Sequence, residues 1–214
     1  NILFSATGAN LKIVATNLEI GIIKNIAAEI EMEGEITIPA KTLVEIISSL
    51  PQATVVFETE GENITITSSK FKAKINGISA GEFPAIPLSG EIGVTFPKAV
   101  FLTSSQILFA SAVDEGRPQL TGILTEVKDS RLEMVATDGF RLAHRTVNLE
   151  DKAANFKSLI PKRTFEEILH IISEEDVAVV NISISQDQNQ AVFPLGPTIL
   201  SSRLIDGAFP SWEK

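Results

Sequence analysis

The sequence predicts an α+β protein made of two copies of one domain. Runs of alternating apolar and polar residues, which are typical of strands, dominate the chain, and a few amphipathic helices interrupt them. An internal repeat predicts the duplication, because four segments recur in the same order about 121 to 126 residues apart. Residues 1–6 match 122–127, 11–17 match 132–138, 38–47 match 160–169, and 78–84 match 204–210.

The second copy is longer at its start than the first. Residues 92–121 have no counterpart before residue 1, and the chain does not begin with Met. We therefore expect a fragment of a longer protein, with a first domain at 1–88 that lacks its N-terminal part and a second domain at 91–214. The boundary is predicted near 87–93, where Pro-Leu-Ser-Gly interrupts the strand and helix patterns.

Strands are predicted where apolar and polar residues alternate and turn residues separate the runs. This pattern predicts strands over 11–16, 53–59, 63–67, 70–76, 132–137, 177–185 and 198–204. We expect the strands to form antiparallel sheets, with hairpin turns such as the one at Gly61-Glu-Asn63.

Two amphipathic helices are predicted at 39–50 and 161–173. The apolar face of the first consists of Leu43, Ile46, Ile47 and Leu50, and that of the second of Phe165, Ile168, Leu169 and Ile172. Both segments begin with Pro, whose fixed φ suits the first helical position. Each helix is therefore expected to pack one face on a sheet.

A third helix is predicted at about 97–113, and its counterpart in the first copy would precede residue 1. Its inward face is expected to hold Phe101, Leu108 and Ala112, and its other face the small residues Ser104, Ser105 and Ser111. Each complete copy would then contain two helices packed on antiparallel sheet.

Composition excludes several classes of protein. The absence of cysteine excludes disulfides, thiolate metal sites and cysteine nucleophiles. No apolar run approaches the roughly 18 residues needed to cross a bilayer, so we expect a cytoplasmic protein without a membrane partner. The net charge of −9 argues against a simple basic nucleic-acid binder, but not against a protein whose positive charge is confined to one face.

Catalytic motifs are missing from the sequence. His144 and His170 have no metal-ligand spacing, and no nucleophile elbow, phosphate loop or dinucleotide fingerprint occurs. Four glutamates, at positions 29, 31, 33 and 35, alternate at the period of a strand; a solvated strand or loop is favoured over a metal site. We expect no enzyme activity and no cofactor; a hydrolase using Asp138 or Asp206 is a minor alternative.

Residues 136–143, Ala-Thr-Asp-Gly-Phe-Arg-Leu-Ala, differ most from their repeat partner. The first copy reads Ala-Thr-Asn-Leu-Glu-Ile at 15–20, with neither the Asp-Gly pair nor the Arg. Asp-Gly between two strands is typical of a hairpin turn, which is the simplest interpretation. A function specific to the second copy is the alternative, because it would appear where one copy diverges from a shared scaffold.

Four motifs resemble the bacterial DNA polymerase III beta subunit family, the sliding clamps. These are Val-Ala-Thr-Asp-Gly-Phe-Arg-Leu-Ala at 135–143, Leu-Thr-Gly-Ile-Leu at 120–124, Ile-Pro-Lys-Arg at 160–163, and Ser-Arg-Leu-Ile-Asp-Gly-Ala-Phe-Pro at 202–210. The resemblance covers most of the family's first domain and its second domain. It implies the DNA clamp fold, with three domains per subunit in a homodimeric ring that encircles duplex DNA and makes the replicative polymerase processive.

The resemblance also implies which residues face DNA. In the family, helices line the hole of the ring, and here the candidates for sequence-independent phosphate contacts are Lys41, Lys162, Arg163 and Arg117. Glu45, Glu166 and Glu167 dilute this charge, so the affinity for DNA should be weak and sensitive to salt. Closure of the ring around DNA replaces tight binding, which makes the net charge of −9 compatible with this function.

A pocket for linear peptides from polymerases, the clamp loader and repair proteins is implied between the second and third domains. Its residues in this chain would be Leu120, Thr137, Gly139, Phe140, Arg141, Leu142 and Pro210. Phe140 stands where many family members have His. The remaining pocket residues would follow Lys214, so this fragment should bind peptides weakly.

The strand at 70–76 corresponds to the edge through which the family's first domain meets the third domain of the other subunit. Phe71 is the expected apolar contact, flanked by Lys70, Lys72 and Lys74. An edge strand protected by lysines is the alternative. For the whole protein, the leading hypothesis is a processivity clamp, and the alternative is a peptide-binding interaction module without a DNA function.

Overall fold

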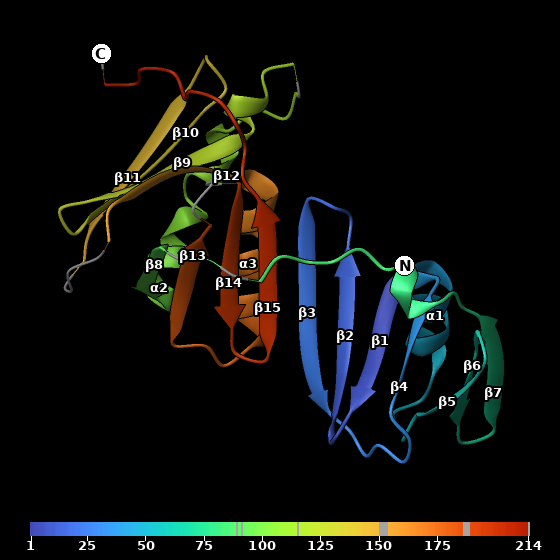
Figure 1. Ribbon diagram of the computed structural model, residues 1–214. Coiled ribbons are helices and arrows are strands. Elements are labelled where there is room, and N and C mark those ends of the chain that lie inside the picture. The colour runs from blue at the N-terminus through green and yellow to red at the C-terminus, as the bar shows by residue number, and fades with distance from the viewer. Residues whose placement is uncertain (89, 91, 115, 150–153, 186–188, 214) are drawn as a thin grey trace. The chain divides into compact units, whose positions relative to one another are not determined.

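The computed structural model describes residues 1–88, 90, 92–114, 116–149, 154–185 and 189–213. The chain divides into two compact units, Asn1–Ile86 and Pro87–Lys214, which Figure 1 colours from blue to green and from green to red. Within the boundary predicted at 87–93, residues 89 and 91 lie outside the described residues.

The first unit packs one helix against two antiparallel sheets. Its four-stranded sheet has the order β4-β1-β2-β3 and consists of β1 (Ile2–Thr7), β2 (Asn10–Thr16), β3 (Ile20–Ala27) and β4 (Gly34–Ile38). Helix α1 (Ala40–Ser49) follows, and β5 (Val56–Glu60), β6 (Asn63–Ser68) and β7 (Phe71–Asn76) form the three-stranded sheet. The core contains Phe4, Ile36, Ile38, Leu43, Ile64, Ile66 and Ile75.

In its described residues, the second unit contains two four-stranded sheets and two α-helices. The first half runs through β8 (Ile92–Pro97), α2 (Lys98–Ser104), β9 (Gly122–Lys128), β10 (Arg131–Thr137) and β11 (Leu142–Asn148). The second half runs through β12 (Phe156–Pro161), α3 (Lys162–Glu174), β13 (Val179–Ile184), β14 (Gln190–Leu195) and β15 (Thr198–Arg203). Each half therefore has the same order of one strand, one helix and three strands.

The two halves of the second unit exchange their first strands. Strand β8 pairs with β13 of the second half, and β12 pairs with β9 of the first half, which gives the sheets β11-β10-β9-β12 and β15-β14-β13-β8. Each helix is therefore preceded by a strand of one sheet and followed by a strand of the other.

The sequence repeat is also a repeat of strand register. Leu3 pairs with Val14 of β2 and Thr37 of β4. The matching residue of the second copy, Leu124, pairs with Val135 of β10 and Leu159 of β12. Because a slip of one residue would move every side chain to the opposite face of the sheet, equal registers show that both copies bury equivalent positions. The predicted α+β fold of tandem, related domains is confirmed.

A proline directly precedes the first residue of each α-helix in the described part of the chain. Pro39, Pro97 and Pro161 have φ near −56° but ψ between 116° and 141°, so each is the cap before the first helical residue. The prediction that Pro occupies the first helical position is therefore wrong. Pro39 directly follows β4, whereas Pro97 and Pro161 are the last residues of β8 and β12. Because ψ is still extended at all three prolines, none of them is the first residue of a helical turn.

The helix predicted at 97–113 is shorter than expected. Helix α2 ends at Ser104, and a 3-10 helix at Leu108–Ala110 follows it. Ser104 and Ser111 are buried instead of lying on the outer face, and each hydroxyl donates to the carbonyl three residues earlier. Serine hydroxyls that bond the backbone in this way compete with helical hydrogen bonds, which favours an early end to the helix.

The two long helices differ in how completely they bury their apolar face. In α3, Phe165 and Ile168 are fully buried, and Phe165 stacks on Phe101 of α2 with 5.8 Å between ring centroids. In α1, the predicted core residue Ile47 is 39% exposed and Val44 is 55% exposed. The prediction for Ile47 is wrong because α1 is the only α-helix within Asn1–Ile86, so no second helix covers that side.

Candidate functional site

The loop between β10 and β11 is a tight turn built by Thr137 and Asp138. The Thr137 hydroxyl donates to the carbonyl of Arg141 at 2.7 Å and accepts from the Gly139 N–H at 3.0 Å. Asp138 Oδ1 accepts from the N–H groups of Phe140 at 2.9 Å and Arg141 at 3.0 Å. Gly139 has φ of +91°, in the left-handed region where glycine has no steric cost.

The same turn occurs in the first copy, although its sequence lacks Asp-Gly. The Thr16 hydroxyl donates to the Ile20 carbonyl at 2.9 Å and accepts from the Leu18 N–H at 3.0 Å. Asn17 Oδ1 accepts from the N–H groups of Glu19 and Ile20. Leu18 takes the place of the glycine, with φ of +74°. The two copies therefore share the backbone hydrogen bonds of this turn and differ in its side chains.

What is specific to the second copy is the pair of arginines that contact the turn, because the first copy has Glu19 and no arginine there. Arg141 Nε donates to Asp138 Oδ2 at 2.9 Å, and Arg117 Nη2 donates to the Asp138 carbonyl at 3.1 Å. The backbone N–H groups of Phe140 and Arg141, followed by the guanidinium of Arg141, hold the pKa of Asp138 below its ordinary value. Both carboxylate oxygens of Asp138 therefore accept hydrogen bonds within the turn. This argues against the alternative that Asp138 is a catalytic residue of a hydrolase.

The residues predicted for the peptide pocket differ in exposure. Leu120 and Thr137 are buried, whereas Phe140 is 96% exposed and Leu142 is 46% exposed. Pro210 is exposed in the segment after β15 and directly follows Phe209, which packs against the cluster of Leu124, Val135 and Leu159. The structure brings five of the seven predicted residues, 137 and 139–142, together in the turn and the start of β11. An exposed Phe beside an Arg is typical of a protein-binding surface.

Arg117, predicted to face DNA, lies against this turn. It directly precedes the 3-10 helix Pro118–Leu120, and a Cβ on Gly139 would meet its Nη1 at 3.2 Å. Another neighbour was not predicted: Arg141 Cζ lies 5.7 Å from the centroid of the Phe109 ring. The sequence gives no signal for Phe109. It lies in the 3-10 helix Leu108–Ala110, where the sequence predicted a continuous α-helix over 97–113.

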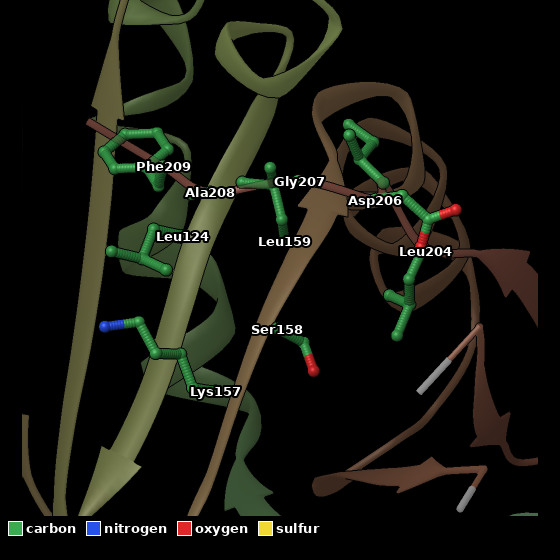
Figure 2. Close-up of a pocket in the computed structure, with 10 residues that line it drawn as sticks. Leu124, Lys157, Ser158, Leu159, Leu204, Asp206, Gly207, Ala208 and Phe209 are labelled. Atoms are coloured by element: carbon green, nitrogen blue, oxygen red, sulfur yellow. The ribbon is translucent and has the colours of Figure 1, made fainter. Parts of the chain in front are cut away.

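An open cleft of about 830 Å³ in the same unit was also not predicted. Figure 2 shows Leu124 of β9 and Lys157, Ser158 and Leu159 of β12 opposite the segment after β15. None of the seven predicted pocket residues lines it. Lys157 pairs with Glu126 at 2.8 Å. The full lining is Leu124, Lys157, Ser158, Leu159, Leu204, Ile205, Asp206, Gly207, Ala208 and Phe209.

The helix cations predicted to face DNA lie in the first turns of α1 and α3. Lys41 is exposed, Lys162 pairs with Glu166 at 3.7 Å, and Arg163 pairs with Glu167 at 4.0 Å. Sequence reasoning missed Lys98, the first residue of α2. Each α-helix of the described residues therefore has a cation at its first or second position and no acidic residue in its first turn. The helix dipole disfavours this placement, so helix stability does not explain it.

The predicted dimer edge is the outer strand of the three-stranded sheet. Strand β7 pairs only with β6 in the described part of the chain. Phe71 is 36% exposed at its start, Lys70 and Lys72 are exposed, and Lys74 pairs with Glu60 at 3.5 Å. An exposed edge strand with one large apolar residue is compatible with both predicted interpretations. It could pair with another chain, or its lysines could prevent such pairing.

The four glutamates at 29–35 do not line one strand. Only Glu35 lies in a strand, β4, and its Oε1 accepts from the Ser5 hydroxyl at 2.6 Å. Glu33 Oε1 accepts from the Gly8 N–H at 2.8 Å. Among the described residues, no group of three or more His, Cys, Asp or Glu is arranged to hold a metal ion. No helix in the described ranges is long and apolar enough to span a bilayer.

The matched strand registers of the two copies define a duplicated α+β scaffold, and the turn with Asp138 and Arg141 distinguishes the second copy from the first. Comparison with protein families shows which family has this scaffold. Residues 1–87 match the N-terminal domain of the DNA polymerase III beta subunit, and residues 97–211 match its central domain. The chain belongs to the DNA polymerase III beta subunit family.

Curated relatives include the beta sliding clamps of Synechococcus elongatus and Caulobacter vibrioides. The first is 34% identical over 99% of this chain and 58% of the relative, and the second is 32% identical over 100% and 59%. The chain thus spans just under three fifths of the length of these proteins. The resemblance to this family drawn from the four motifs is confirmed.

Solved structures of the family share the fold. The DNA polymerase III subunit beta of Pseudomonas aeruginosa has a TM-score of 0.91 at 26% identity, covering 100% of this chain and 59% of that one. A beta subunit from Eubacterium rectale has a TM-score of 0.91 at 29% identity, covering 99% and 58%. One of the similar structures is a P. aeruginosa sliding clamp bound to griselimycin, with a TM-score of 0.91 at 26% identity, covering 100% and 58%.

Proposed function

We propose that this chain is part of a sliding clamp that encircles duplex DNA and makes a replicative polymerase processive. Membership of the DNA polymerase III beta subunit family over both units carries the proposal, because the relatives are named beta sliding clamps. In this proposal residues 1–88 belong to the first clamp domain and 91–214 form the second. A third domain would complete each subunit of a cytoplasmic, homodimeric ring. The clamp itself catalyses no reaction.

The DNA contacts are assigned to the first turns of the helices. Lys41, Lys98, Lys162 and Arg163 would attract phosphates without reading sequence, as a sliding protein requires. Their placement against the helix dipole supports this role, because it has no benefit for the helices themselves. The ion pairs of Lys162 and Arg163 with glutamates keep the attraction weak, so affinity should fall steeply with salt.

The partner site is assigned to the turn 137–141 with Leu120, Leu142 and Pro210. Polymerases, the clamp loader and repair proteins would bind there through linear peptides, with Phe140 and Leu142 as apolar contacts and Arg141 as a hydrogen-bond donor. Strand β7 with Phe71 is assigned to the contact with the other subunit. Residues of the third domain would complete both surfaces.

Stimulation of a polymerase on a long primed template tests the proposal. The complete protein should increase product length in the presence of its loader, and replacing both Lys162 and Arg163 by Ala should reduce that increase. Lys157→Ala is the matched control, because Lys157 is a paired lysine on a sheet of the same unit. A protein that binds the polymerase but never lengthens its products would contradict the proposal and favour a peptide-binding module.

A further inference from the structure

Phe109 is a large aromatic residue exposed in the middle of a buried segment. Its neighbours Ile107, Leu108 and Ala110 are between 0% and 7% exposed, whereas Phe109 is 57% exposed. The buried neighbours anchor the 3-10 helix Leu108–Ala110, so the position of Phe109 is fixed by the core while its ring lies outside it. Core packing therefore does not account for an aromatic residue at this position.

The ring of Phe109 lies next to the guanidinium of Arg141. The distance of 5.7 Å from Arg141 Cζ to the ring centroid is within the range of cation–π attraction. On its other side, Arg141 is held by the bond from Nε to Asp138 Oδ2. Two segments far apart in the sequence thus restrain one side chain, which nevertheless stays 60% exposed. Its terminal nitrogens have no hydrogen-bond partner among the described residues.

We propose that Phe109 is a positioning residue of the partner site, which holds the Arg141 guanidinium in the orientation that binds a peptide. This inference rests on the proposed function of the turn 137–141. The partner group would be a carbonyl or carboxylate oxygen of a linear peptide, because guanidinium terminal nitrogens only donate. A pre-oriented arginine loses less side-chain freedom on binding, which increases affinity without a new contact.

Replacing the ring while keeping its bulk tests this role. Phe109→Leu in the complete protein should weaken binding of the replicative polymerase from the same organism about two- to five-fold, the size expected from an exposed cation–π contact. Phe109→Tyr and Phe109→Trp, which keep an aromatic face, should bind as the unsubstituted protein does. Binding is measured by surface plasmon resonance, and circular dichroism checks that each variant melts at the same temperature.

A double-mutant cycle separates positioning from a general effect on the surface. In an Arg141→Ala background, Phe109→Leu should cause no further loss of affinity, because the side chain that it positions is absent. Equal binding by Phe109→Leu and the unsubstituted protein, or an undiminished loss in the Arg141→Ala background, would overturn the inference while leaving the proposed function intact. Failure of the unsubstituted protein to bind the polymerase would overturn both.

Discussion

At the scale of single residues, one turn is built twice with different residues at its strained position. Leu18 has φ of +74° and Gly139 has φ of +91°. A left-handed conformation costs an ordinary L-residue roughly 1–2 kcal/mol, whereas glycine adopts it freely. The hydrogen bonds from Thr16 and Asn17 hold Leu18 there despite this cost.

Exchanging these residue types should change stability in opposite directions. Leu18→Gly should raise the free energy of unfolding by up to about 1 kcal/mol, because relief of strain exceeds the added freedom of the unfolded chain. Gly139→Ala should lower it by about 1 kcal/mol, since alanine at positive φ is strained. Urea denaturation followed by circular dichroism measures both. A loss of stability in Leu18→Gly as large as that in Gly139→Ala would contradict the account.

The pKa of the Asp138 carboxyl should be lower than its ordinary value, mainly because backbone N–H groups donate hydrogen bonds to the carboxylate. The N–H groups of Phe140 and Arg141 are the largest causes and the Arg141 side chain is smaller. Because the folded-state pKa is lowered, the stability that the carboxylate contributes is complete above its unfolded pKa of about 3.9 and is lost as pH falls through the folded value.

A carbon-13 NMR titration measures this pKa directly. In Arg141→Ala the midpoint should rise only part of the way, because the two backbone bonds remain. Asp138→Asn should keep the turn, as Asn17 does in the first copy, and should remove this pH dependence of unfolding. A midpoint at or above the ordinary value in the unsubstituted protein would show that the turn does not hold the carboxylate in solution.

Sequence patterns predicted part of this site. The pocket residues came from motif resemblance, and the turn could be foreseen from Asp-Gly. The matching turn at Leu18 was missed because glycine was treated as its signal, although Thr followed by Asn or Asp occurs in both copies. Phe109 could not be predicted, since its contact with Arg141 depends on where a 3-10 helix brings two distant segments together.

At the scale of elements, the strands with clear alternation of apolar and polar residues were predicted, whereas strands such as β9 were not. The predicted strands are confirmed as β2, β5, β6, β7, β10, β13 and β15, with ends shifted by a few residues. Strand β9 was missed because nearly all of its side chains are buried, so it has no polar face to reveal its period. Helix ends were also uncertain where serine and proline compete with regular backbone bonds.

The contact between α2 and α3 should be a major source of stability in the second unit. Phe101 stacks on Phe165 and meets Phe96 and Phe193 at edge-type angles. Phe101→Ala should lower the free energy of unfolding by about 3–5 kcal/mol. The neighbouring Leu102→Ala, a residue 45% exposed on the same helix, should cost far less. Urea denaturation compares the two, and equal costs would show that the aromatic cluster is not the centre of this core.

At the scale of the whole molecule, the repeat was the strongest signal in the sequence. Four matched segments predicted two related domains, and the matched registers of Leu3 and Leu124 show why the signal survives. Each copy buries its core only if the apolar side chains of these strands stay on the same face of the sheet, so the sequence pattern of the strands is retained in both copies. The function could not be predicted from the repeat itself; it came from the motifs and from family membership.

The central claim is that the complete protein is held on DNA by encircling it. The most direct measurement loads the complete protein onto a nicked circular plasmid, removes unbound protein, and follows retention before and after cutting the plasmid once. Because the helix cations attract phosphates only weakly, the account predicts long retention on the circle and rapid loss from the linear form, even at high salt. Equal retention on circular and linear DNA would contradict it.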